Sequence, residues 1–137
     1  MACFFGIDYG VKRIGLSVCN REETIASPVT TLSACGHVAE DASAVAAYAA
    51  KYEVDAFVVG LPLNMDDSEG KQAKIARRFG DELARIADKP VHFWDERLSS
   101  LTAEELLQPA ELTRKKRKAR IDRVAAQVIL QSFLDAR

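Results

Sequence analysis

The chain has 137 residues, a length typical of one domain, and 48% of them are hydrophobic while 28% are charged. This balance excludes a disordered or fibrous protein, and no apolar run approaches the ~20 residues that a membrane helix requires. The formal net charge of −1 indicates no class of partner, but residues 114–120 (RKKRKAR) carry six cations in seven positions.

The cysteines and histidines argue against a disulfide framework and against a zinc site. Cys3, Cys19 and Cys35 are odd in number and form no CxxC pair, which is typical of reduced thiols. His37 and His92 are isolated from each other. We find no signal peptide, and we therefore expect a cytoplasmic protein.

The predicted elements begin with three strands, over residues 3–9, 13–19 and 27–32. The short gap between the first two predicts an antiparallel hairpin. A helix over residues 37–52 follows, because its apolar residues recur at steps of three and four.

The second half of the chain alternates strands with helices. Residues 55–61 are apolar throughout and predict a central strand, and a loop (PLNMDDSEG) leads to a helix over 71–88 that contains Gly80. A strand over 90–96 precedes a short helix with Thr102 and Glu105 at capping-box spacing. The basic segment then leads into a last helix from about residue 120 to 136. This order predicts a single α/β domain (1–137), with a five-stranded mixed sheet covered by helices on both faces.

Acidic residues stand at the ends of two predicted strands. Asp8 closes the first strand, and Asp95 and Glu96 close the fifth. Ligands of α/β sheets gather outside the carboxyl ends of the strands, so Asp8 and Glu96 could converge there. The sequence does not say whether their side chains share one face of the sheet.

A third acid, Asp122, lies on the apolar stripe of the last predicted helix, with Ala125 and Ala126. That stripe should face the sheet, and the small alanines allow a close approach. Three converging carboxylates repel one another unless a cation lies between them, and Mg²⁺ or Mn²⁺ suits oxygen ligands. Such a site activates water and stabilises charge on a phosphoryl group.

Each acid also has an ordinary structural interpretation. Asp8 could be a turn residue, and Glu96 could pair with Arg97. Asp122 could pair with a neighbouring arginine. The metal-site hypothesis therefore depends on all three acids meeting.

Several residues near these acids are candidates for contacts with substrate phosphates. Lys12 and Arg13 lie in the predicted hairpin turn, and Asn64 lies in the loop before the helix over 71–88, whose start Asp67 or Ser68 could cap. Further candidates are Arg97 and the cations of the basic segment, Arg114, Lys115, Lys116, Arg117 and Lys118. The usual interpretation of such a charge run is a solvated surface, but its place directly before Asp122 favours contacts with nucleic-acid phosphates.

Four motifs, FGIDYGVKRIGLSV, VVGLPLNMDDSEG, WDERLSS and IDRVAAQVIL, resemble the YqgF family in order and spacing over essentially the whole chain. These bacterial RNase H-like proteins are described as pre-16S rRNA nucleases or Holliday junction resolvases. The resemblance implies an RNase H-like fold and a divalent-metal-dependent nuclease with Asp8, Glu96 and Asp122 as its acidic residues. The family loop usually reads NMDGS, and Asp67 stands here in place of the glycine.

Three classes of function remain open. The resemblance implies a nuclease, acting on structured RNA or on branched DNA; a junction resolvase would be expected to form a homodimer, because it cuts two strands. The GIDYG hairpin is also similar to the phosphate-binding hairpin of sugar kinases, actin and Hsp70, but those proteins need two such domains. A nucleic-acid-binding module without catalysis is the third class, and clustered acids argue against it.

Overall fold

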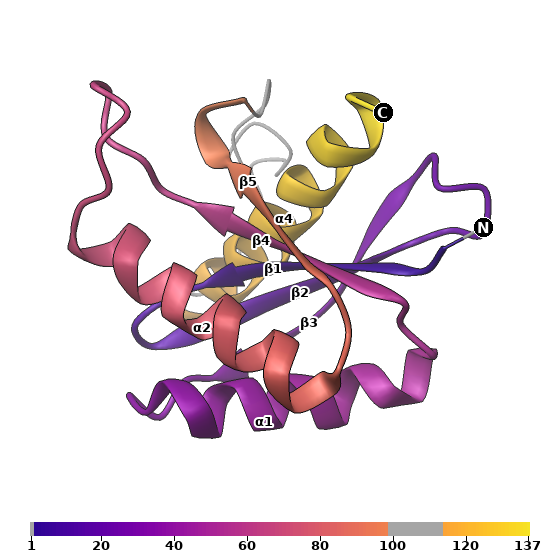
Figure 1. Cartoon of the computed structure of the whole chain (residues 1–137), viewed down its shortest axis with the longest axis horizontal. Coiled ribbons are helices and arrows are strands. Elements are labelled where there is room, and N and C mark those ends of the chain that lie inside the picture. Colours follow the sequence, from indigo (N-terminus) through magenta and orange to yellow (C-terminus); the bar gives the residue numbers. More distant parts are fainter. Residues whose placement is uncertain (1, 99–113) are drawn as a thin grey trace.

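The computed structural model describes residues 2–98 and 114–137, with side chains for residues 2–98 and 124–137. The short helix predicted around Thr102 and Glu105 lies outside the described residues. The described elements, in chain order, are the strands and helices shown in Figure 1: β1 (Phe4–Tyr9), β2 (Arg13–Cys19), β3 (Ala26–Ser33), α1 (Val38–Ala49), the 3₁₀ helix η1 (Ala50–Tyr52), β4 (Ala56–Leu61), α2 (Lys71–Ala87), β5 (Val91–Asp95), the 3₁₀ helix η2 (Glu96–Leu98) and α4 (Arg114–Asp135).

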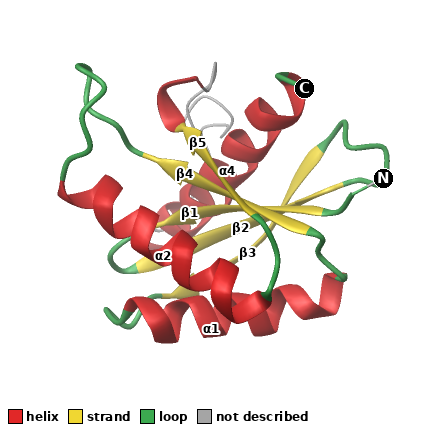
Figure 2. Cartoon of the chain, viewed as in Figure 1, coloured by secondary structure: helices red, strands yellow, loops and turns green. Residues whose placement is uncertain are grey.

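The strands form one twisted sheet in the order β3-β2-β1-β4-β5 (Figure 2). β1 pairs antiparallel with β2, and β2 pairs antiparallel with β3. β4 pairs in parallel with β1, and β5 pairs in parallel with β4, as expected for strands joined by helical crossovers. The predicted mixed sheet, with antiparallel strands first and parallel strands after, is therefore confirmed.

Helices cover both faces of this sheet, as predicted. α1 and α2 pack together on one face, where Phe5, Phe57 and Phe79 belong to a buried cluster. α4 crosses the opposite face over β1, β2 and β3 (Figure 1). Its Leu130 is fully buried there with Val58. None of the described helices is long and apolar enough to cross a membrane.

Two glycines allow the helices to approach the sheet closely. A Cβ on Gly6 would lie 2.6 Å from the Cβ of Leu130 and 2.9 Å from the carbonyl oxygen of Ala126, so α4 rests directly on β1. A Cβ on Gly80 would lie 2.4 Å from the ring of Phe93. Gly80 weakens the helix signal in the sequence, and this contact between α2 and β5 explains why a glycine occupies the position.

The last helix begins earlier than predicted. α4 starts at Arg114 rather than near residue 120, so the basic segment forms the first turns of the helix instead of leading into it. Lysine, arginine and alanine all have high helix propensity, and a helix can extend beyond its apolar stripe when its residues favour it. The prediction relied on the apolar stripe alone and therefore placed the boundary too late.

Candidate functional site

Asp8 lies near the end of β1, the central strand of the sheet. The strand buries Phe5 and Ile7 against α1 and α2, while Gly6 faces α4. Because side chains alternate along a strand, Asp8 shares the α4 face with Gly6. Its backbone pairs with Gly15 of β2, and its side chain is partly buried.

Glu96 reaches Asp8 from the end of β5. It begins η2 directly after β5, and β4 lies between β5 and β1. A Cβ on Gly60 of β4 would lie 2.7 Å from Oε1 of Glu96 and 3.0 Å from its Cγ, so the side chain passes directly over this glycine. Ile7 pairs with Val59, which places Asp8 and Gly60 side by side in the next step of the register. The structure therefore brings Asp8 and Glu96 onto one face.

The pKa of Glu96 is raised, in part because Asp8 is close. Burial is the largest cause that raises it, followed by the negative charge of Asp8, a hydrogen bond with Asp8 and the charge of Asp95, and together they raise the pKa of Glu96 from 4.5 to about 7. A hydrogen bond between two carboxyl groups requires a proton on one of them. In the free protein, Asp8 and Glu96 therefore form a pair that favours holding one proton near neutral pH.

Gly60 is a position of the candidate site that the sequence analysis did not identify. An isolated glycine inside an otherwise apolar strand often marks a close approach by another group, and this signal was available at residues 55–61. Here the approaching groups are Glu96 and the Cδ1 atom of Ile129, 2.6 Å from the position of a Cβ.

We expect Gly60→Ala to separate Glu96 from Asp8 without unfolding the protein. A methyl group would push the flexible Glu96 side chain away from its position over β4, because the contacts at 2.6–2.7 Å leave no room. The titration of Glu96, followed by carboxyl NMR, should move toward the ordinary range of a glutamate. Ala56→Gly, at the other end of β4, is the control for changing a residue of this strand. Unchanged titration of Glu96 would contradict the placement of its side chain over Gly60.

The third predicted acid lies on the helix that covers this face. α4 places the backbone of position 122 one turn before Ala126, whose carbonyl lies over Gly6 and accepts a hydrogen bond from Ser17 at 2.8 Å. The Asp122 side chain lies outside the described residues. Among the side chains that the structure describes, no group of three or more His, Cys, Asp or Glu residues could hold a metal ion.

Arg97 binds Asp95 and the loop between β4 and α2, and it does not pair with Glu96. Its Nε atom donates to both carboxylate oxygens of Asp95 at 3.0 and 3.1 Å, and Nη2 contacts the same carboxylate at 2.8 Å. Nη2 also contacts Asp67 at 2.6 Å, and Nη1 donates to the carbonyl oxygen of Asn64 at 2.7 Å. The alternative pairing of Glu96 with Arg97 is therefore wrong. Asp95 is held by Arg97, which lowers its pKa.

The other candidate binding residues come from the β1–β2 hairpin, from the loop after β4 and from α4. Lys12 is exposed in the turn between β1 and β2, and Arg13 begins β2. Asn64 is exposed and donates from its side chain to the hydroxyl of Ser68 at 2.9 Å. The backbone of residues 114–118 belongs to α4, and these five side chains lie outside the described residues.

Neither Asp67 nor Ser68 caps α2. The N-cap residue is Gly70, and no side chain caps it. Ser68 instead donates from its backbone and hydroxyl to Asp66, at 3.1 and 2.5 Å. The capping prediction is wrong because the hydrogen bonds of these side chains close the loop on itself, before the helix begins.

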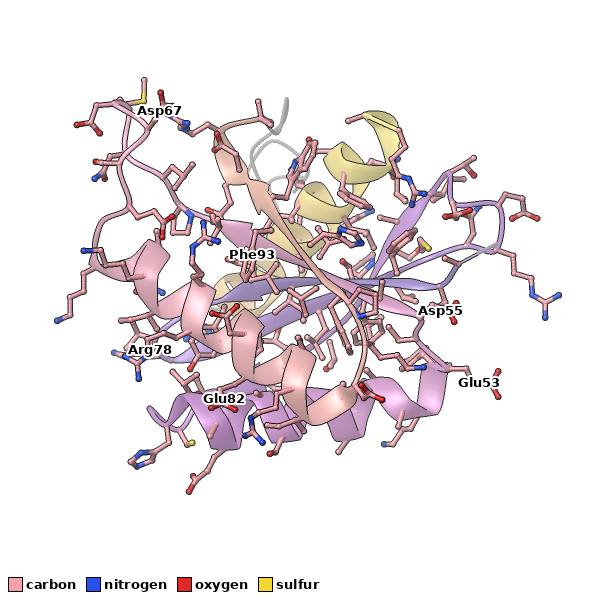
Figure 3. The ribbon with its side chains drawn as sticks, viewed as in Figure 1. Glu53, Asp55, Asp67, Arg78, Glu82 and Phe93 are labelled. Atoms are coloured by element: carbon pink, nitrogen blue, oxygen red, sulfur yellow. The ribbon has the colours of Figure 1, made fainter. Side chains whose placement is uncertain are left out.

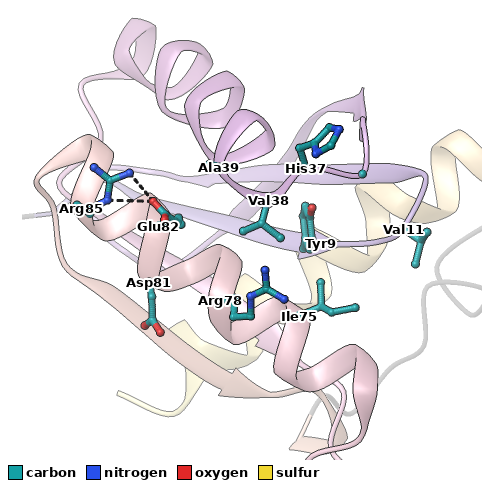
Figure 4. Close-up of a pocket in the computed structure, with 11 residues that line it drawn as sticks. Tyr9, Val11, His37, Val38, Ala39, Ile75, Arg78, Asp81, Glu82 and Arg85 are labelled. Atoms are coloured by element: carbon teal, nitrogen blue, oxygen red, sulfur yellow. Dashed lines mark hydrogen bonds and ion pairs between the residues drawn. The ribbon is translucent and has the colours of Figure 1, made fainter.

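A separate cavity of about 700 Å³ lies on the opposite face of the sheet. Tyr9, Ile75 and Arg78 contribute to its lining, between α1 and α2 (Figure 4). Tyr9 follows Asp8 in β1 and therefore points away from it, stacking on Phe79 and donating to buried Asp41 at 2.5 Å. The paired acids consequently lie outside this cavity.

Sequence comparison places the chain among known proteins. The family model described as "RuvX: Holliday junction resolvase" matches residues 2–136. The chain belongs to the RuvX family. Two relatives named "Putative pre-16S rRNA nuclease" support this: one from Caldanaerobacter subterraneus subsp. tengcongensis is 43% identical over 96% of this chain and 94% of its own length. The other, from Anaeromyxobacter sp. (strain K), is 46% identical over 96% of both chains. The YqgF-type resemblance seen in the sequence is thereby confirmed.

Structure comparison supports the same fold. The RuvX family chain is similar to "Thermus thermophilus RuvC structure", with a TM-score of 0.62 and 14% identity over 98% of this chain and 96% of that chain. A second RuvC structure, from T. thermophilus and in complex with a Holliday junction substrate, has a TM-score of 0.60 and 13% identity over 99% and 96%. At these identities the likeness shows the RNase H-like fold alone.

Proposed function

We propose that this RuvX family protein is a metal-dependent nuclease that hydrolyses phosphodiester bonds while the 5′ end of pre-16S rRNA is processed. The observation that carries the proposal is the pair of carboxyl groups, Asp8 in β1 and Glu96 directly after β5, which are joined by a hydrogen bond. A fold gains no stability from placing two acids together. A cation between them would remove their repulsion and turn the pair into a binding site.

The described residues fit a hard divalent cation. Asp8 and Glu96 supply oxygen donors, their side chains are partly buried, and the raised pKa of Glu96 comes first from burial and then from the negative charge of Asp8. We propose that Asp8, Glu96 and Asp122 hold Mg²⁺ or Mn²⁺. A bound ion would supply an activated water and stabilise the charge that develops on the phosphoryl group.

The remaining candidates would hold the substrate backbone. We propose that Lys12, Arg13, Asn64, Arg97 and the cations of the first turns of α4 contact phosphates on either side of the acids. Lys12 and Asn64 are exposed, and Arg97 directly follows Glu96 in the chain. Three free cysteines among the described residues accord with a reducing compartment, and we infer a cytoplasmic location.

A cleavage panel tests the proposal. The substrates are a precursor rRNA fragment with the 5′ extension of 16S rRNA, a four-way DNA junction and a linear DNA duplex, each with Mg²⁺, Mn²⁺ or EDTA. We expect metal-dependent cleavage of the rRNA precursor and little cleavage of the linear duplex. Failure to cleave all three substrates with either metal would reject the proposal.

The same panel decides the alternative, a Holliday junction resolvase. The RuvX family is described as one of Holliday junction resolvases, and the RuvC-like fold also favours this candidate. A resolvase must cut two strands, so preference for the junction should come with a homodimer in sedimentation experiments. Salt-dependent binding of nucleic acid, with no cleavage under any metal condition, would indicate a binding module instead.

A further inference from the structure

Asp67 occupies the left-handed backbone conformation. Its φ angle is 71°, in the left-handed region where glycine is the usual residue. Its side chain is 83% exposed and therefore contributes little to the core. The contact that its carboxylate makes is the ion pair with Nη2 of Arg97 at 2.6 Å (Figure 3 labels Asp67 on its loop).

The two carboxylates on Arg97 are held differently. Asp95 meets the guanidinium through Nε and Nη2 and is only 20% exposed, so it forms a two-point contact in a sheltered position. Asp67 meets a single nitrogen from a solvent-exposed loop. An exposed one-point ion pair is weak and exchangeable, whereas the two-point pair fixes the guanidinium in place.

The loop is also tied to Arg97 through its backbone. The carbonyl oxygen of Asn64 accepts from Nη1 of Arg97 at 2.7 Å and from the amide of Asp67 at 3.0 Å. Asp67 and Arg97 therefore converge on one carbonyl. Arg97 itself directly follows Glu96, the acid that is hydrogen-bonded to Asp8. The residue that holds Asp67 is therefore the chain neighbour of one of the two paired acids.

We propose that Asp67 is an internal competitor for substrate phosphate at Arg97. A guanidinium binds carboxylates and phosphates with the same N–H groups, so the Asp67 carboxylate takes the position on Nη2 that a backbone phosphate of nucleic acid would take. Substrate binding displaces Asp67, while Asp95 keeps Arg97 oriented. This inference rests on the proposed function, because it assigns the displacing ligand to the nucleic-acid backbone.

Binding without metal tests this competition separately from cleavage. The probes are a fluorescein-labelled RNA stem-loop with a 5′ extension and a labelled four-way DNA junction, titrated in EDTA with the full chain. We expect Asp67→Asn to tighten binding about three- to tenfold and to steepen the slope of log K against log salt by about one, because Arg97 gains one phosphate contact. Asp67→Gly should do the same, since glycine accepts the φ angle at this position.

A matched control separates competition from simple loss of negative charge. Asp66→Asn removes the same charge from the adjacent residue, whose carboxylate accepts hydrogen bonds from Ser68. Asp66→Asn should tighten binding less than half as much as Asp67→Asn does. Combining Asp67→Asn with Arg97→Gln should abolish the gain, because the competition takes place on the guanidinium.

The outcomes are distinguishable. Equal tightening by Asp66→Asn and Asp67→Asn, or a gain that persists together with Arg97→Gln, would overturn the competition and leave the proposed nuclease intact. Phosphate contacts are strong at about 50 mM salt. If neither the unmodified chain nor any variant binds the probes there, both the competition and the proposed nuclease are overturned.

Discussion

Asp8→Asn should lower the rate of cleavage by about 10³-fold while leaving substrate affinity in EDTA within about twofold. The substitution keeps the size of the side chain but removes the negative charge that the proposed site offers to a cation. Lys12 and Arg97, the proposed phosphate contacts, are unchanged. The measurement is single-turnover cleavage of the rRNA precursor with Mg²⁺, together with fluorescence anisotropy of the same RNA without metal.

A control variant and the expected stability of Asp8→Asn separate loss of catalysis from loss of folding. Asp81→Asn removes a carboxylate from the exposed surface of α2, which lies on the opposite face of the sheet, and it should cleave at the unmodified rate. Asp8→Asn should not destabilise the free protein at pH 8, because it removes a charge that repels Glu96. Cleavage by Asp8→Asn at the rate of the Asp81→Asn control would mean that Asp8 is not in the active site.

The second large effect concerns pH. The pKa of Glu96 is raised from 4.5 to about 7 in the folded protein, first by burial and then by Asp8. Between these two values the folded state keeps a proton on Glu96 that the unfolded state has lost. The contribution of Glu96 is therefore fully present below about pH 4.5, and it is lost as the pH rises through 7. A difference of this size corresponds to about 3 kcal/mol in the free energy of unfolding.

Denaturant unfolding of the metal-free protein at pH 5 and at pH 8 measures this loss. Glu96→Gln is the control, because an amide cannot ionise and every other titrating group is retained. We expect the difference in stability between the unmodified chain and Glu96→Gln to change by about 3 kcal/mol over this range, with the unmodified chain losing more at high pH. The lowered pKa values of Asp66, Glu69 and Asp95 act at lower pH and do not enter this window. An unchanged difference would contradict the placement of Glu96 beside Asp8.

The proton held by Asp8 and Glu96 should also make the affinity for metal depend on pH. A cation on Asp8 and Glu96 competes with the shared proton, so the apparent affinity for Mn²⁺ should rise with pH up to about 7 and then level off. Isothermal titration with Mn²⁺ at several pH values checks this expectation. Glu96→Gln should weaken the binding and remove most of its pH dependence.

Local sequence patterns determine most of the fold. The run over residues 55–61 is apolar throughout and predicts a central strand, and the structure pairs β4 in parallel with β1 at the middle of the sheet. The early hairpin and the later alternation of strands with helices fixed the mixed topology. The start of α4 was misplaced because helix propensity extends the helix beyond its apolar stripe.

Local pattern also identified Asp8 and Glu96, because each acid directly follows or ends an apolar strand. Their meeting was decided only by the tertiary structure. It requires β5 to be placed next to β4, and a glycine at position 60 to leave space for Glu96 to cross that strand. These are contacts between segments far apart in the chain, and a pattern read along the chain contains no information about the distance across a sheet.

The partner of Arg97 shows the same division between sequence and structure. The sequence places Arg97 beside both Asp95 and Glu96, with equal opportunity to pair with either. The structure pairs it with Asp95 and with Asp67, thirty residues earlier, because the loop after β4 folds back toward the end of β5. Sequence thus determined which chemical groups this protein has at the ends of its strands. Tertiary packing decided which of those groups neutralise one another, and left Glu96 beside Asp8 with a raised pKa.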